Sequence, residues 1–219
     1  MKSKSFSPML YVAFVEFLAV TVLSVLFKVE FYNALPLMIS TTVMFMQTRV
    51  NRYTFILGGL NAIVYSFAFF HMELYGQAAM SLVVSFPLQM ITFINWQKHT
   101  LKGKTEIKRF SLNGRVAVFA GMAVMWTIFY IILSASGSEY IMLDNTVTVI
   151  GTVSSVICIF RYSEFAVLQM LTSFINIVLF TNMTFDNTSR VIWLIHSIYT
   201  FICATVTFIK TQKELKGGK

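Results

Sequence analysis

The chain has 219 residues, of which 57% are hydrophobic and only 12% are charged, and its mean hydropathy is +0.72. This composition excludes a soluble globular domain and indicates an integral membrane protein. The formal charge of +8 at pH 7 raises the alternative of a nucleic-acid partner, so the positions of the cations along the chain decide their role.

Eight segments are apolar enough to be membrane spans, since about twenty apolar residues cross a bilayer. The first follows the N-terminal "MKSKSFSPML" and lacks the small-x-small cleavage site of a signal peptide, so we expect it to be retained. The second and sixth are short, and a count of seven remains if one of them is not a span. The predicted spans are 8–27, 31–48, 53–70, 75–96, 115–135, 145–160, 165–182 and 190–210.

The connections between these spans separate the cations by side. With the N-terminus in the cytoplasm, all but two of the 17 Lys and Arg residues fall on the cytoplasmic side, as the positive-inside rule expects. The two exceptions are Lys28 and Arg190. Membrane topology therefore explains the basic charge, and we predict no nucleic-acid partner.

Glu16, in "VAFVEFLAV", is the only acid well inside a predicted span. A carboxyl group within the membrane is a functional candidate, and a proton-coupled carrier requires such a group. The opening helix is expected to be peripheral, however, and Glu16 has no obvious basic partner. A protonated carboxyl with no part in coupling is the alternative.

Amide side chains recur at helical spacing in the third and seventh spans. Asn61 and Tyr65 share one face of the third span, and Gln169 and Asn176 share one face of the seventh. Such residues can hold membrane helices together by hydrogen bonds, but two matching stripes favour the lining of a cavity.

The fourth span carries Gln89, Phe93 and Trp96 on one face, just after Pro87. Proline removes a backbone donor and kinks a helix, so we expect Gln89 to face a substrate path. Trp96 lies at the cytoplasmic end, where an interfacial anchor is the alternative to a wall of the binding site.

The eighth span places Trp193 and His196 on one face near its outer end. Trp193 is either a substrate contact or part of an aromatic belt at the membrane interface. His196 is either a proton carrier or a packed, hydrogen-bonded residue.

The connection "QKHTLKGKTEIKRFSLNG" divides the chain into two halves of four spans each. An offset of about 112 residues places Lys98 on Lys210 and aligns the turn "TRVNRYTF" with "IFRYSEF". An even number of spans per half predicts a parallel repeat, which is typical of transporters. The sequence shows no nucleotide-binding loop, no zinc-protease motif and no Cys/His cluster, so we predict neither an enzyme nor a cofactor nor a metal site.

Two passages carry a resemblance to a known family. "GGLNAIVYSFAFFHMELYGQAAMSLVVSFPLQMITFINW" and "LDNTVTVIGTVSSVICIFRYSEF" resemble the first and second halves of the PnuC-like nicotinamide riboside transporters. The resemblance implies a SWEET-like fold, in which two three-helix bundles are joined by a linker helix. It divides the chain into a peripheral span (1–30), a first bundle (31–97), a basic cytoplasmic loop (98–114), a linker helix (115–136), a second bundle (145–210) and a cytoplasmic tail (211–219).

The same resemblance implies a homotrimer in the inner (plasma) membrane, with both termini in the cytoplasm. It implies facilitated diffusion of a small aromatic nucleoside or B-type vitamin, which a cytosolic kinase then traps by phosphorylation. The expected substrate-binding residues are Gln89, Asn61, Tyr65, Phe93, Trp96, Gln169, Asn176 and Trp193, and the candidates for proton coupling are Glu16 and His196.

Four positions depart from the family pattern. Phe165 and Leu168 stand where members that carry nicotinamide riboside have a Trp-x-x-Trp pair, and Phe208 and Ile209 replace a terminal Trp. Because stacked aromatic rings hold a flat ligand, riboflavin, thiamine or a deoxynucleoside remain alternative substrates. A proton-coupled carrier and a membrane subunit without transport activity are the alternatives of other classes.

Overall fold

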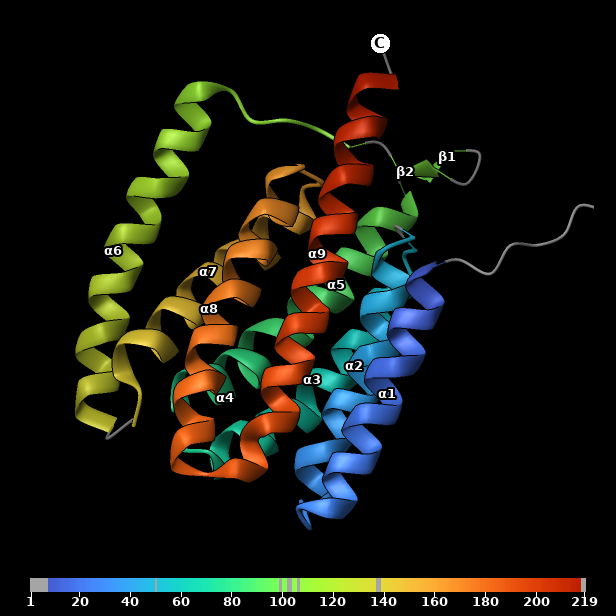
Figure 1. The fold of residues 1–219 in the computed structure, drawn as a ribbon. Helices are drawn as coiled ribbons and strands as arrows, with labels where there is room; N and C mark the ends of the chain where they lie inside the picture. Colours follow the sequence, from blue (N-terminus) through green and yellow to red (C-terminus); the bar gives the residue numbers. More distant parts are fainter. Residues whose placement is uncertain are drawn as a thin grey trace, which may run out of the picture.

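The computed structural model describes residues 8–49, 51–98, 100–101, 104–105, 107–136 and 139–217. Parts of the predicted termini and of the basic loop, including His99 and Lys102, lie outside these residues. The described chain is almost entirely helical (Figure 1). Its elements are α1 (Pro8–Leu26), α2 (Phe31–Gln47), α3 (Thr54–His71), α4 (Tyr75–Ala79), η1 (Met80–Ser85), α5 (Phe86–Lys98), β1 (Thr100–Leu101), β2 (Lys104–Thr105), α6 (Leu112–Ser136), α7 (Ile141–Ile159), α8 (Glu164–Asp186), η2 (Thr188–Arg190) and α9 (Val191–Gly217).

All eight predicted spans are helices. In the described chain seven helical segments are long and apolar enough to cross a membrane: α1, α3, the continuous segment from α4 through α5, α6, α7, α8, and the segment from η2 into α9. The predicted span 31–48 is not among these seven. Its helix, α2, has 17 residues, which is the lower limit for a span. The predicted all-α polytopic membrane protein is therefore confirmed.

Six helical segments form a closed ring. In order around the ring they are α2, α3, the segment from α4 through α5, α7, α8 and α9, which packs back on α2. Two helices lie outside this ring: α1 packs on α2 and α9, and α6 packs on α7 and α4 (Figure 1). The two outer helices occupy equivalent places in the two halves of the chain, as expected for a parallel repeat.

The charged residues lie at the two ends of the bundle. α1 begins and α9 ends at the same end, which also carries the connection from α5 to α6 (Figure 1). We call this the basic end, because the helix ends and connections there carry many cations, among them Arg49, Arg52, Lys98, Lys108, Arg109, Arg115, Arg161, Lys210 and Lys213. The opposite, acidic end carries Glu30, Glu73, Glu139 and Asp186 together with Lys28 and Arg190.

The predicted basic loop is partly structured. β1 and β2 form an antiparallel pair, and Lys108 exchanges backbone hydrogen bonds of 2.8 Å with Arg161 and Ser163 after α7. Arg115 and Glu164 form an ion pair of 3.0 Å nearby. The connection between the halves is therefore attached to the turn between α7 and α8.

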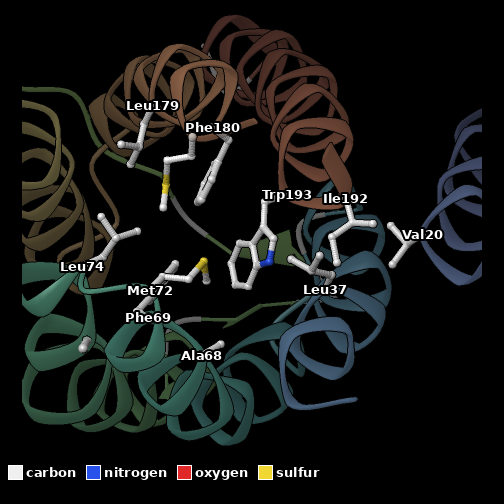
Figure 2. Close-up of a cluster of buried hydrophobic side chains, with 12 residues drawn as sticks. Val20, Leu37, Ala68, Phe69, Met72, Leu74, Leu179, Phe180, Ile192 and Trp193 are labelled. Carbon is white, nitrogen blue, oxygen red and sulfur yellow. The ribbon is translucent and has the colours of Figure 1, made fainter. Parts of the chain in front are cut away.

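Two apolar clusters fill the interior of the ring, one toward the acidic end and one toward the basic end. The acidic-end cluster includes Leu37, Met72, Leu179 and Trp193 and joins residues of both halves (Figure 2). The basic-end cluster consists of Phe55, Trp96, Ile150, Ile157, Cys158, Phe165, Ala166 and Leu168. Burying such a side chain contributes about 1.5 to 3 kcal/mol relative to leaving it exposed to water. These clusters therefore stabilise the contact between the two halves.

Hydrogen bonds join the helix ends of neighbouring ring segments. At the acidic end the buried carboxylate of Asp144 accepts hydrogen bonds from the backbone N–H groups of Gly76 (3.0 Å) and Gln77 (3.1 Å), which begin α4. At the basic end Trp96 Nε1 donates to the carbonyl of Cys158 at 2.9 Å, and Lys210 Nζ donates to the carbonyl of Thr48. Each contact gives a backbone group at a helix end a side-chain partner.

The continuous segment from α4 through α5 contains a π-helical turn near its middle. η1 is a π-helical turn that directly precedes Phe86 and Pro87. A π turn is wider than an α turn, and such turns often occur at functional sites. Pro87 therefore follows a local widening of the helix beside the interior of the ring, and the kink expected at Pro87 stays a prediction.

Candidate functional site

A cavity of about 320 Å³ lies inside the ring, between the two apolar clusters. All six ring segments contribute residues to its lining, and the outer helices α1 and α6 contribute none. Its volume is within the range of roughly 300 to 1,000 Å³ that small-molecule sites occupy. The interior of the ring therefore has the size and position of a binding site within the membrane.

The lining of this cavity combines apolar side chains with amides and hydroxyls. No Asp, Glu, Lys or Arg is among the described residues that line it, and His196 is the one titratable imidazole there. Amides and hydroxyls supply the polar surface. Such a lining suits a ligand that forms several hydrogen bonds and carries little charge.

Six buried polar atoms of the lining have no hydrogen-bond partner in the described protein. The acceptors are the Oδ1 atoms of Asn61 and Asn176, and the donors include Gln77 Nε2 and Trp193 Nε1. The hydroxyls of Thr54 and Thr148 complete the set. Each such group costs about 1 to 3 kcal/mol if it stays unpaired, so the cavity is built to form hydrogen bonds with a guest.

Asn61 is held in place by its other amide atom. Its Nδ2 donates to the carbonyl of Pro36 at 2.9 Å, which turns Oδ1 away from α2. Pro36 sits inside α2 and its own carbonyl is the acceptor, so the Asn61 side chain joins α3 to α2 at this proline. The predicted stripe of Asn61 and Tyr65 does line the cavity.

Aromatic rings form one wall of the cavity. Tyr65, Phe69, Phe180 and Trp193 pack around one another with ring centroids 5.3 to 5.7 Å apart. Figure 2 shows the Trp193 indole pointing from its helix into the interior of the ring. Trp193 is buried, with 2% of its surface exposed, so it does not belong to an aromatic belt at the membrane surface.

Gln89 occupies a position that Gly58 makes available. A Cβ atom at Gly58 would lie 2.2 Å from Gln89 Oε1, well inside contact distance, so the bare backbone of α3 is what lets this amide lie against it. Both residues line the cavity. Gln169 also lines it, but its amide is hydrogen-bonded to Gln47 across the ring, at 2.6 and 3.1 Å.

Phe93 and Trp96 do not reach the cavity wall. Trp96 belongs to the basic-end cluster, where it meets Phe55 edge-on at 4.9 Å and is 2% exposed, and Phe93 is partly buried against this cluster. Their face of the helix continues from Gln89 into the apolar layer that closes the cavity toward the basic end. Trp96 is thus a packed core residue, which differs from both expected roles.

Glu16 has a basic partner after all. Its Oε1 lies 2.8 Å from Nδ1 of His196, and Thr41 Oγ1 donates to its other oxygen. His196 lines the cavity, and its Nε2 lies 3.0 Å from Ser40 Oγ and 3.1 Å from the Tyr65 hydroxyl. The buried residues of α1 are Ala13, Glu16 and Val20, which lie on the side of the helix that faces the ring.

Sequence reasoning missed several lining residues. Ser40 and Gln47 lie in α2, whose predicted span was short, and Gln77 and Thr148 lie in the motifs "LYGQA" and "LDNTVT" that carried the family resemblance. Polar residues inside the span 31–48 were the available signal. Of the two departures after the second-half turn, Phe165 lines the cavity and Leu168 is buried in the basic-end cluster.

A ring of membrane helices built from two repeats around a buried polar cavity defines a class of protein, the multi-pass membrane transporter. Comparison with known proteins agrees with this class. The chain belongs to the nicotinamide mononucleotide transporter family, whose model matches residues 29–213. The predicted membership is therefore confirmed.

Two relatives are similar in sequence or in fold. The nicotinamide riboside transporter PnuC of Neisseria mucosa is 27% identical over 164 residues, which are 72% of this chain and 62% of that protein. The chain thus spans less than two thirds of the length of this curated relative. The crystal structure of the vitamin B3 transporter PnuC matches with a TM-score of 0.75 and 19% identity over 95% of both chains, so the two share their fold.

Proposed function

We propose that this chain carries nicotinamide riboside, or a closely similar vitamin-like nucleoside, across the membrane. The observation that supports this most strongly is the set of six unpaired polar atoms beside an aromatic wall. A nucleoside offers a flat ring to stack and several hydroxyl and amide groups to hydrogen-bond, which are the two features this cavity complements.

The roles of the residues follow from their atoms. Asn61 and Asn176 present acceptor oxygens to sugar hydroxyls or to a carboxamide N–H, and Gln77 presents a donor to a carbonyl or hydroxyl oxygen. Gln89, which lies against Gly58, supplies a further amide. Tyr65 and Trp193 hold the aromatic ring of the ligand, while Phe93 and Trp96 belong to the apolar layer that closes the cavity toward the basic end.

The cavity favours a nucleoside over a nucleotide. A phosphate carries about two negative charges at pH 7 and is bound in proteins by Arg, Lys or helix N-termini. Neither cation is among the described residues of the lining. We therefore assign the unphosphorylated compound to this chain, although the family takes its name from the mononucleotide.

The mode of transport follows the family resemblance. We propose facilitated diffusion in the inner membrane through a SWEET-like pair of three-helix bundles, with the termini and the basic end in the cytoplasm. The concentration of cations at that end supports this orientation. Trapping of the substrate by a cytosolic kinase and assembly as a homotrimer belong to the same proposal.

A binding screen on the purified protein tests the ligand. The protein in detergent is titrated by calorimetry with nicotinamide riboside, nicotinamide mononucleotide, thiamine, riboflavin and thymidine. We expect the riboside to bind and the mononucleotide to bind at least tenfold more weakly. Equal binding of the two nicotinamide compounds would contradict the assignment, and so would binding of only riboflavin or thymidine.

Proton coupling is a second candidate, because Glu16 lies 2.8 Å from His196 and His196 lines the cavity. It is tested in proteoliposomes with an imposed pH gradient. Accumulation of substrate against its gradient, abolished by Glu16→Gln, would support coupling. Uptake that stops at equal concentrations would exclude it.

A further inference from the structure

The charge near the cavity comes from outside the ring. The described lining has no carboxylate, yet Glu16 of the outer helix α1 reaches the lining through one residue, His196. Glu16 is 4% exposed and His196 is 5% exposed, so neither is screened by solvent in the described protein. The interaction between two charged groups is stronger in the low-dielectric interior of a protein than in water.

Both oxygens of Glu16 have close polar neighbours. One oxygen lies 2.8 Å from His196 Nδ1, and the other contacts Thr41 Oγ1, whose hydroxyl also lies 2.9 Å from the Leu37 carbonyl. On its other side His196 Nε2 faces the hydroxyls of Ser40 and Tyr65, at 3.0 and 3.1 Å. An ionised Glu16 beside a neutral His196 with its proton on Nδ1 gives the pair one net negative charge, and this state is the premise of the inference.

The neighbouring titratable groups leave that charge uncancelled. They are Tyr65 on α3 and Tyr199 and Cys203 on α9, all of which interact electrostatically with Glu16. Phenol and thiol groups are normally neutral at pH 7. Among the described side chains that contact Glu16 and His196, none is a Lys or Arg.

We propose that Glu16, acting through His196, makes this cavity selective for a ligand whose ring carries a positive charge. The proposal rests on the proposed function and narrows it: a pyridinium such as nicotinamide riboside or a thiazolium such as thiamine is preferred over the neutral rings of riboflavin and thymidine. Glu16 is a positioning and charge-supplying residue, since its carboxylate orients His196 and does not touch the ligand.

An uncompensated carboxylate in a membrane interior is costly, and a cationic ligand offsets that cost.

The test compares two ligands that differ by their ring charge: nicotinamide riboside and its reduced dihydro form, which is neutral. Calorimetric titrations are made on wild type, Glu16→Gln, Glu16→Asp and the control Glu30→Gln, which neutralises an exposed acid at the acidic end. We expect wild type to prefer the cation and Glu16→Gln to lose about tenfold of that preference, equal to about 1.4 kcal/mol. Glu16→Asp should retain most of it and Glu30→Gln all of it.

Two results would overturn the inference: an unchanged ratio of the two affinities in Glu16→Gln, or an equal loss for both ligands. If Glu16→Gln does not fold, the affinities of wild type for the two ligands decide, and equal affinity for the cation and its neutral reduced form overturns the inference.

The ligand assignment and the charge inference fail separately. If only thiamine binds, the assignment to nicotinamide riboside is wrong, and the inference is read from the loss of thiamine affinity in Glu16→Gln. If only riboflavin or thymidine binds, the charge inference is wrong, while a vitamin or nucleoside carrier remains. If no compound binds, both fail.

Discussion

The indole nitrogen of Trp96 donates a hydrogen bond to the carbonyl oxygen of Cys158, with N and O 2.9 Å apart. The bond joins the last turn of α5, in the first half of the chain, to the last turn of α7, in the second half. Lys210 Nζ makes the corresponding contact from α9 to the Thr48 carbonyl at the end of α2. At the basic end, each half of the chain thus donates a hydrogen bond to a helix end of the other half.

Replacing this indole should affect stability more than binding. Trp96→Phe keeps a ring against Phe55 but removes one donor to the Cys158 carbonyl, which still accepts from the Arg161 N–H, so the loss is about 0.5 to 1.5 kcal/mol. We expect a lower melting temperature in detergent, with the dissociation constant for the substrate changed less than twofold. A large loss of affinity in a stable variant would instead make Trp96 a binding residue.

The contact between Gly58 and Gln89 gives a prediction of the opposite kind. In Gly58→Ala the new Cβ would lie 2.2 Å from Gln89 Oε1, so the flexible amide must move while the backbone stays in place. Substrate affinity should fall about tenfold, with little change in stability. Calorimetric titration and thermal unfolding measure the two effects separately.

Gly121→Ala is the matched control, because nothing lies within 4 Å of a Cβ atom at Gly121 in α6. Alanine is the better helix former by about 0.5 to 1 kcal/mol, so this variant should be as stable as wild type or more so. Its affinity should not change. A parallel loss of affinity in both variants would refute the role of Gln89.

Two threonines should respond to the same substitution with opposite signs. Thr148 Oγ1 is buried without a partner in the described protein, so Thr148→Val relieves a desolvation cost of about 1 kcal/mol and raises the melting temperature of the free protein. Because its hydroxyl lines the cavity, affinity should fall.

Thr41 Oγ1 instead donates to buried Glu16, and Thr41→Val removes a hydrogen bond to a charged group, worth about 1.5 to 3 kcal/mol. Its melting temperature should fall. The comparison is made by thermal unfolding of both variants without ligand, and a shift in the same direction for both would contradict the assignment of these two hydroxyls.

Asp144 should be essential to the acidic end. Asp144→Asn leaves one acceptor for the two N–H groups of Gly76 and Gln77 and removes the charge at the start of α4. We expect the free energy of unfolding to fall by about 1 to 3 kcal/mol. The control Glu139→Gln removes an exposed charge at the same end and should change it by less than about 0.5 kcal/mol.

Local chemistry predicted the helices and part of the site. Apolar length and the distribution of cations gave the spans, and helical spacing gave the stripes of Asn61 with Tyr65 and of Gln169 with Asn176, all of which line the cavity. The family resemblance added the transporter class. These features depend on residues close together in the chain, which a periodic pattern can reveal.

The remainder depends on contacts between distant segments. Glu16 and His196 are 180 residues apart, and Gln47 and Gln169 are 122 residues apart, so no spacing rule could pair them. Phe93 shares a helix face with Gln89, but the ring encloses a cavity over only part of its length. Where that cavity ends was not readable from either helix alone.

The π turn η1 has a consequence for the count of residues along its helix. Gln77 and Gln89 are twelve residues apart, and at 3.6 residues per turn they would point about a third of a turn away from each other. A π turn takes up about one extra residue, so the interval acts as about eleven residues, close to three full turns. Both amides can then line one cavity from a single unbroken helix. η1 therefore acts as a one-residue insertion that corrects the phase of the helix between two levels of the membrane.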